Sequence, residues 1–100
     1  MSRLTESEVL EADLTDWRMS DDALHAVFDT GSFVAGLAFV ERIAEAAEAA
    51  NHHPDITLTY PRVGVKLWSH DVGGVTRRDI DLAVVISGLA VVAGHAGRPG

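Results

Sequence analysis

Cysteine is absent from this sequence of 100 residues. Its absence excludes a disulfide scaffold and thiolate catalysis. Basic residues are also few, since eight Lys and Arg stand against fifteen Asp and Glu and the formal net charge is −7. The broad basic surface that neutralises phosphates is therefore missing, so neither nucleic acid nor an anionic membrane is an expected partner.

An apolar leader and a long hydrophobic run are missing too. Met1-Ser2-Arg3 is followed by Glu6 and Glu8 rather than by the apolar core of a signal peptide, so we expect a cytoplasmic protein. The most apolar segment, residues 82–93, covers about 12 residues where about 20 are needed to cross a bilayer. This segment is expected to be a buried helix.

The length of the chain indicates one domain, because a chain of this size buries only about two-thirds of its unfolded surface and cannot form two cores. We expect this domain over residues 1–96 and a disordered tail over 97–100. Hydrophobic residues make up 47% of the sequence, and the helix over 82–93 is apolar nearly all round. Both features indicate a homo-oligomer, although an alanine-rich core explains the composition equally well.

The hydrophobic pattern changes period along the chain. Apolar residues recur every three to four positions in some segments, as one face of a helix requires, and alternate in others, as in a half-buried strand. Helices are predicted over residues 5–12, 33–50 and 77–93, and strands over 14–19, 23–28, 56–60 and 63–68. This order predicts an α+β fold in which helices pack on one face of a four-stranded antiparallel sheet.

The second half of the chain carries a spaced set of proton-transfer groups. Glu48 precedes His52 by four residues, so on a continuous helix the carboxylate can orient the imidazole; the alternative is a solvated pair at a helix end. Pro54 ends the helix, because the residue before a proline is pushed out of the helical region, and His53 therefore leaves it. His70 follows the next hairpin, which can return beside the pair. Three imidazoles in this arrangement indicate acid/base chemistry.

Two other chemistries compete for the same residues. Glu48, His52 and His70 form the two-histidine, one-carboxylate set that binds zinc or iron, but no H-x-H, H-x-x-x-H or C-x-x-C spacing accompanies them. Ser69 is unsuited to be a nucleophile, because adjacent side chains of one strand do not easily form a Ser-His hydrogen bond and no G-x-S-x-G motif is present. Chemistry without a metal or a nucleophile is favoured.

Some of the polar residues nearby also have structural explanations. Thr76 and Asp79 form a capping-box pair at the start of the last helix, with Asp in place of the usual Glu or Gln. Asp71 suits a turn, and Trp68 suits a core or an interface. Each of these residues is therefore both a candidate for the site and a candidate for the scaffold.

The spacing of these residues resembles the pattern of the pterin-4a-carbinolamine dehydratase family. The resemblance covers most of the chain, because it extends through the last helix and, more faintly, back to the first strand. The residues that carry it most clearly are Glu48, His52, His53, Pro54, Tyr60, His70, Gly74, Thr76, Asp79, Leu82, Ala83 and Ile86, with Trp17 and Phe33 matching less closely.

The resemblance implies a lyase that removes water from 4a-hydroxytetrahydropterin and forms quinonoid dihydropterin. It implies that His52 and His70 act as acid and base, that His53 mainly holds the pterin, and that Glu48 orients or charges His52. It also implies a supporting role for Asp79, no metal and no organic cofactor. The pocket would be lined by Asn51, His52, His53, Trp68, Ser69, His70 and Asp71.

The resemblance further implies a dimer or tetramer and a functional link to a pterin-dependent hydroxylase in tetrahydrobiopterin recycling. Two residues depart from the family pattern. Asn51 stands where Asp is frequent, and Trp68 replaces what is often a small hydroxyl residue, so the fit of the substrate could differ. The alternative function is that of a dehydratase-like assembly or interaction protein, although members recruited as assembly factors tend to lose the histidines that this sequence retains.

Overall fold

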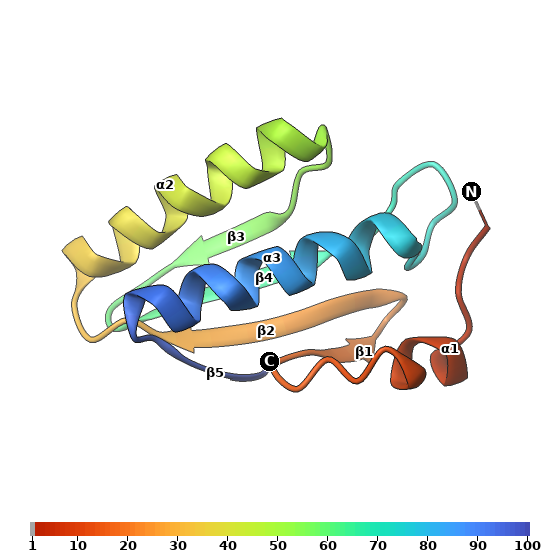
Figure 1. Ribbon diagram of the computed structural model, residues 1–100, viewed down its shortest axis with the longest axis horizontal. Helices are drawn as coiled ribbons and strands as arrows, with labels where there is room; N and C mark the ends of the chain where they lie inside the picture. Colours follow the sequence, from red (N-terminus) through yellow and green to blue (C-terminus); the bar gives the residue numbers. More distant parts are fainter. Residues whose placement is uncertain (1) are drawn as a thin grey trace.

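A computed structural model describes residues 2–100, so that only Met1 of the predicted domain lies outside it. The protein is an α+β domain, as predicted, with an antiparallel sheet and two long helices (Figure 1). Its elements, in chain order, are α1 (Glu6–Glu11), β1 (Arg18–Ser20), β2 (Ala23–Asp29), α2 (Phe33–Ala50), β3 (Asp55–Leu58), β4 (Arg62–Leu67), α3 (Arg77–Ala93) and β5 (Ala96–Pro99).

The sheet has the strand order β1-β2-β4-β3, and β5 pairs with β2 beyond the short β1. β1 covers only residues 23–25 of β2, while β5 pairs with residues 26–29. The prediction of a disordered tail over 97–100 is therefore wrong. The free edge of β2 offers unpaired N–H and C=O groups to the end of the chain, and an ion pair between Arg98 and Asp29 holds the added strand.

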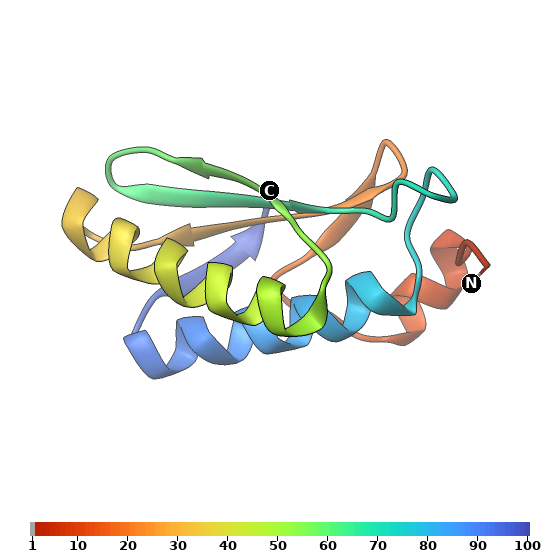
Figure 2. The same ribbon diagram turned by 90° about the horizontal axis from the view of Figure 1, so that it is seen from above.

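Helices α2 and α3 lie side by side against one face of the sheet, and the other face is left without a helix (Figure 2). The core lies between the two layers. Burying each of its larger apolar side chains contributes about 1.5–3 kcal/mol to folding. The core includes Leu24, Ala26 and Phe28 of β2, Val63, Val65 and Leu67 of β4, Phe39 and Ile43 of α2, and Ile80 and Ile86 of α3.

Helix α3 buries one side and exposes the other. Ile86 and Ala90 are buried, whereas Val84 is 57% exposed and Val92 is 89% exposed. The prediction that the whole segment is buried therefore holds for only one of its faces. Within residues 2–100, no helix is long and apolar enough to cross a membrane.

The ends of the long helices agree with the prediction because their caps are present. Ser32 caps α2, and Thr76 and Asp79 form a capping box at the start of α3. The strands differ more. The strand predicted over 14–19 begins only at Arg18, because a turn from Leu14 to Trp17 precedes it.

Candidate active site

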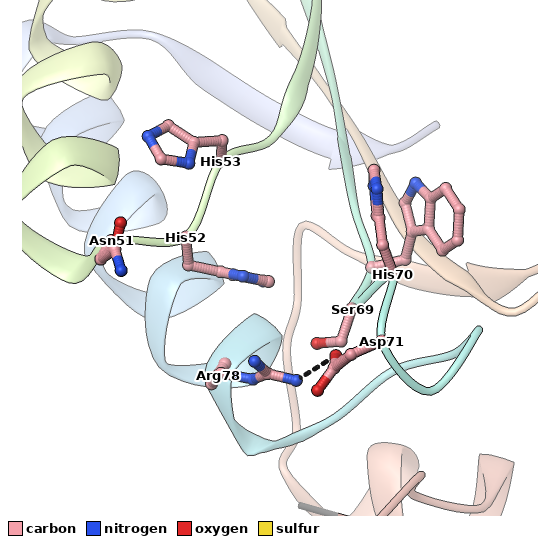
Figure 3. A pocket seen from close by; sticks show the side chains of 8 residues that line it. Asn51, His52, His53, Ser69, His70, Asp71 and Arg78 are labelled. Carbon is pink, nitrogen blue, oxygen red and sulfur yellow. Dashed lines mark hydrogen bonds and ion pairs between the residues drawn. The ribbon is translucent and has the colours of Figure 1, made fainter.

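A cavity of about 410 Å³ lies at one end of the sheet. Asn51, His52 and His53 line it from the segment that follows α2, and residues 68–71 line it from the segment that follows β4 (Figure 3). The structure thus brings together all seven residues predicted to line a pocket. It adds one that was not predicted, Arg78 in the first turn of α3.

The register of the hairpin explains why these segments meet. Asp55, the first residue of β3, pairs with Lys66 near the end of β4. Because the two strands are antiparallel, the residues before β3 and the residues after β4 emerge at the same end of the sheet. The start of α3 reaches this end through a bridge between Ser69 and Gly74.

The histidine pair separates at the end of α2. Asn51 adopts the left-handed conformation, with φ 49° and ψ 42°, which ends the helix. The backbone N–H of His52 then donates to the carbonyl of Ala47. The side chain of His52 turns inward and is 11% exposed, whereas that of His53 is 58% exposed.

His52 is bonded to a fully buried carboxylate. Its Nε2 lies 2.5 Å from Oδ1 of Asp79, and Oδ2 of Asp79 accepts hydrogen bonds from the Ser69 hydroxyl at 2.8 Å and the Thr76 N–H at 2.9 Å. With Asp79 ionised, Nε2 is the donor of this bond, because an ionised carboxylate can only accept. The Nδ1 atom of His52 is then the nitrogen that is free to exchange a proton.

Glu48 pairs with His53, and the predicted pairing of Glu48 with His52 is wrong. The prediction assumed that the helix continues for four residues beyond Glu48. It ends at Ala50 instead, and the left-handed residue that follows destroys the helical spacing. Both partners of the pair are largely exposed, at 58% for His53 and 75% for Glu48.

Residues 68–70 alternate in direction, as a strand end does. Ser69 is buried and bonds to Thr76 as well as to Asp79. His70 is exposed, and its ring stacks on the Trp68 ring with centroids 3.8 Å apart and planes at 29°. The Trp68 indole N–H donates to Asp55 at 3.4 Å. Trp68 therefore contacts a histidine of the site instead of the core.

Arg78 closes the cavity beneath these residues. Its guanidinium donates to Asp71 at 2.6 Å, the contact drawn as a dashed line in Figure 3. This hydrogen bond holds the pKa of the Asp71 carboxyl below its usual range. Asp71 lies in the turn, as predicted. Arg78 was missed because an arginine beside Asp79 in the first turn of a helix resembles any solvated residue.

The residues of the alternative metal set have other partners. Glu48 bonds to His53, and His52 bonds to Asp79. Within the part of the chain that the structure describes, no three histidine, aspartate or glutamate side chains are grouped as metal ligands would be.

The protein is thus a small α+β domain with a cavity lined by three imidazoles. The sequence profile described as Pterin 4 alpha carbinolamine dehydratase matches residues 2–89. The chain therefore belongs to the pterin-4a-carbinolamine dehydratase family.

Relatives from two organisms agree with this assignment. A protein of Thermosynechococcus vestitus, provisionally named pterin-4-alpha-carbinolamine dehydratase, is 49% identical over 81 residues, which are 81% of this chain and 85% of the relative. A protein of Acidobacterium capsulatum with the same provisional name is 43% identical over 91 residues, or 89% of this chain and 99% of the relative.

Two solved structures are similar to this one. The transcriptional coactivator/pterin dehydratase from Brucella melitensis has a TM-score of 0.84 at 36% identity, covering 89% of this chain and 99% of that chain. A pterin dehydratase-like protein described as a RuBisCO assembly factor of the alpha-carboxysome has a TM-score of 0.62 at 21% identity, covering 74% of this chain and 86% of that chain. The second similarity supports the fold alone.

Proposed function

We propose that the protein removes water from a 4a-hydroxytetrahydropterin and releases the quinonoid dihydropterin. The observation that supports this most strongly is that His52 and His70 line one cavity from its two sides (Figure 3), with His52 held by the buried Asp79. A volume of about 410 Å³ lies within the range of small-molecule sites, roughly 300–1,000 Å³. The pterin is the substrate, and the reaction uses no metal and no organic cofactor.

The reaction needs one acid and one base. The bond between C4a and the hydroxyl oxygen breaks, N5 loses its proton, and a double bond forms between C4a and N5. In the proposed mechanism one of the pair His52 and His70 protonates the leaving hydroxyl and the other accepts the proton from N5. Each such transfer contributes about 10²–10⁴ to the rate.

The other residues hold the substrate and the histidines. In this proposal Asn51 and His53 contact the pterin, and Glu48 orients His53. Asp71 sets the position of Arg78 at the floor of the cavity. Ser69 holds Asp79 in place, because its hydroxyl donates a hydrogen bond to the Asp79 carboxylate.

The decay of synthetic 4a-hydroxytetrahydropterin tests the activity directly. Purified protein should accelerate it over buffer, and His52→Ala and His70→Ala should each lower the rate at least about tenfold. Phe33→Leu is the matched control, since Phe33 is an exposed aromatic residue at the far end of α2. A decay rate equal to that in buffer alone would contradict the proposed dehydratase activity. The protein is expected to remain active after exhaustive EDTA treatment, and elemental analysis is expected to find no metal in it.

We further propose that the substrate comes from a pterin-dependent aromatic amino-acid hydroxylase, so that the protein acts in tetrahydrobiopterin recycling in the cytoplasm. A hydroxylase releases its pterin product with the hydroxyl group still at C4a. Added to such a hydroxylase in steady state, the protein should lower the level of the 4a-hydroxy species. An unchanged level would reject the link.

The active form is proposed to be a homodimer or homotetramer. Support comes from the exposed apolar side of α3, where Val91 is 76% exposed and Val92 is 89% exposed. The double variant Val91→Lys and Val92→Lys should lower the sedimentation mass to that of the monomer. Leu10→Lys, at an equally exposed leucine of α1, is the control. A monomeric wild type would contradict this proposal.

The second candidate is an assembly or interaction protein of the dehydratase type. It is favoured by the same exposed apolar side of α3 and by the similarity to the Brucella melitensis protein, which is described as a transcriptional coactivator/pterin dehydratase. The intact histidines favour the enzyme instead. An inactive wild type whose α3 variants lose a protein partner would favour the second candidate.

A further inference from the structure

Trp68 lines the cavity and is one of the two residues that depart from the family pattern. Its ring is stacked on the His70 ring, with 3.8 Å between the centroids. Atoms in van der Waals contact are about 3.5–4.0 Å apart, so a flat ligand between the two rings would need about 7 Å. The two rings therefore leave no room for a flat ligand between them.

The indole ring is itself fixed from two directions. Its N–H donates to Asp55 at 3.4 Å, and the Nζ atom of Lys66 lies 5.7 Å from the ring centroid, within the range of a cation–π contact. Lys66 and Asp55 are paired in the register of β3 and β4. The anchor thus belongs to the hairpin, and Trp68 is half-buried against it.

His70 has no comparable anchor of its own. It is exposed and lies in the segment after β4, and no hydrogen bond of its ring is present among the described residues. His52, in contrast, is held by Asp79. An unrestrained histidine distributes itself over about three χ1 wells and a two-fold χ2, so only about one-third to one-sixth of its population would face the cavity correctly.

We propose that Trp68 is a positioning residue that holds the His70 imidazole in its working orientation, as Asp79 does for His52. This inference rests on the proposed dehydratase function. It assigns Trp68 to the turnover step and not to the recognition of the pterin, because the stacked face of the indole is covered by His70. An aromatic ring at position 68 is the requirement, and the indole N–H has a secondary role.

Steady-state kinetics of three variants test this role. Trp68→Leu should lower kcat about three- to sixfold, with KM changed less than twofold, because the productive fraction of His70 falls while the pterin contacts remain. Trp68→Phe keeps a ring for the stack and should retain at least half of kcat. Phe33→Leu, at an aromatic residue away from the cavity, should leave both constants unchanged.

An NMR measurement gives a readout that is independent of activity. Protons of the His70 ring should be shifted upfield by the indole ring current, and the shift should disappear in Trp68→Leu and persist in Trp68→Phe. Comparison with the spectrum of His70→Gln assigns the resonances. A melting temperature of Trp68→Leu within a few degrees of wild type excludes a loss of fold.

The outcomes separate the two claims. An active wild type whose Trp68→Leu variant has a normal kcat, or a raised KM with a normal kcat, overturns the positioning role and leaves the dehydratase intact. Absence of the upfield shift in wild type overturns the stack. A wild type without activity rejects the proposed function, and the inference falls with it.

Discussion

The two adjacent histidines, His52 and His53, have opposite surroundings. His52 is 11% exposed and bonds to a carboxylate without solvent contact, while His53 is 58% exposed and bonds to a carboxylate that is 75% exposed. A buried carboxylate is costly to leave without its hydrogen-bond partners, whereas exposed ion pairs contribute little. The side of the cavity near Asp79 is therefore fixed by folding, whereas the side near Glu48 is adjustable.

Removal of Asp79 should have the largest effect on this contrast. Asp79→Ala removes the capping box and leaves His52, Ser69 and the Thr76 N–H without their shared acceptor. We expect a loss of about 3–5 kcal/mol in the free energy of unfolding, measured by urea denaturation. Asp81→Ala, an exposed carboxylate of the same helix, should change it by less than about 0.5 kcal/mol. Equal losses in both variants would contradict a special role for Asp79.

The two histidines should differ in kinetics. His52→Ala should lower kcat about tenfold or more, because a proton-transfer group is lost. His53→Ala should act mainly on KM, because His53 is proposed to hold the pterin. The measurement is the initial rate of dehydration over a range of substrate concentrations. If His53→Ala lowered kcat as much as His52→Ala does, the difference between the two histidines would be structural only.

Glu48→Gln should have a smaller effect. The change removes the charge next to His53 and retains the shape of the side chain. We expect kcat/KM to fall less than about fivefold, because exposed ion pairs contribute little and are screened by salt. The difference from wild type should shrink in 0.5 M sodium chloride. A loss as large as that of His52→Ala would show that Glu48 acts on proton transfer.

The ion pair between Asp71 and Arg78 should give the smallest effect, and this effect should be lost in acid. The folded-state pKa of Asp71 lies below its unfolded value because of the hydrogen bond from Arg78. The pair therefore stabilises the fold above the unfolded pKa, about 3.9, and this contribution is lost as the pH falls through the folded pKa. The difference in melting temperature between wild type and Asp71→Asn should be constant from pH 7 to 5 and shrink below about pH 4. A decrease between pH 7 and 5 would assign the effect to another group.

The long helices were predictable because residues close to each end determine where the helix begins and ends. Ser32 and Thr76 cap the starts of α2 and α3, and Pro54 indicates the end of α2. The family resemblance predicted the seven lining residues, and they meet at one cavity because the hairpin register returns the chain to the end of α2.

The errors have two physical causes, a local change in backbone direction and contact between separate segments. The partner of Glu48 was wrong because one left-handed residue redirects the chain after Ala50. The strand β5 was missed because glycine and proline in residues 97–100 resemble a tail, and only the free edge of β2 makes them a strand. The hydrogen bond of the Trp68 indole to Asp55 joins the two strands of the hairpin, and no local pattern reveals it.

Asn51 contributes more through its backbone than through its amide. The left-handed conformation of Asn51 places the His52 side chain in the protein interior and the His53 side chain in water, although the two residues are chemically identical. Asn and Asp both tolerate this region of φ and ψ, so the departure from the family's frequent Asp preserves the division. A β-branched residue does not tolerate this region, so it would not preserve the division between the two histidines. The distinction between the two imidazoles is thus decided by a torsion angle at a residue that need not exchange any proton.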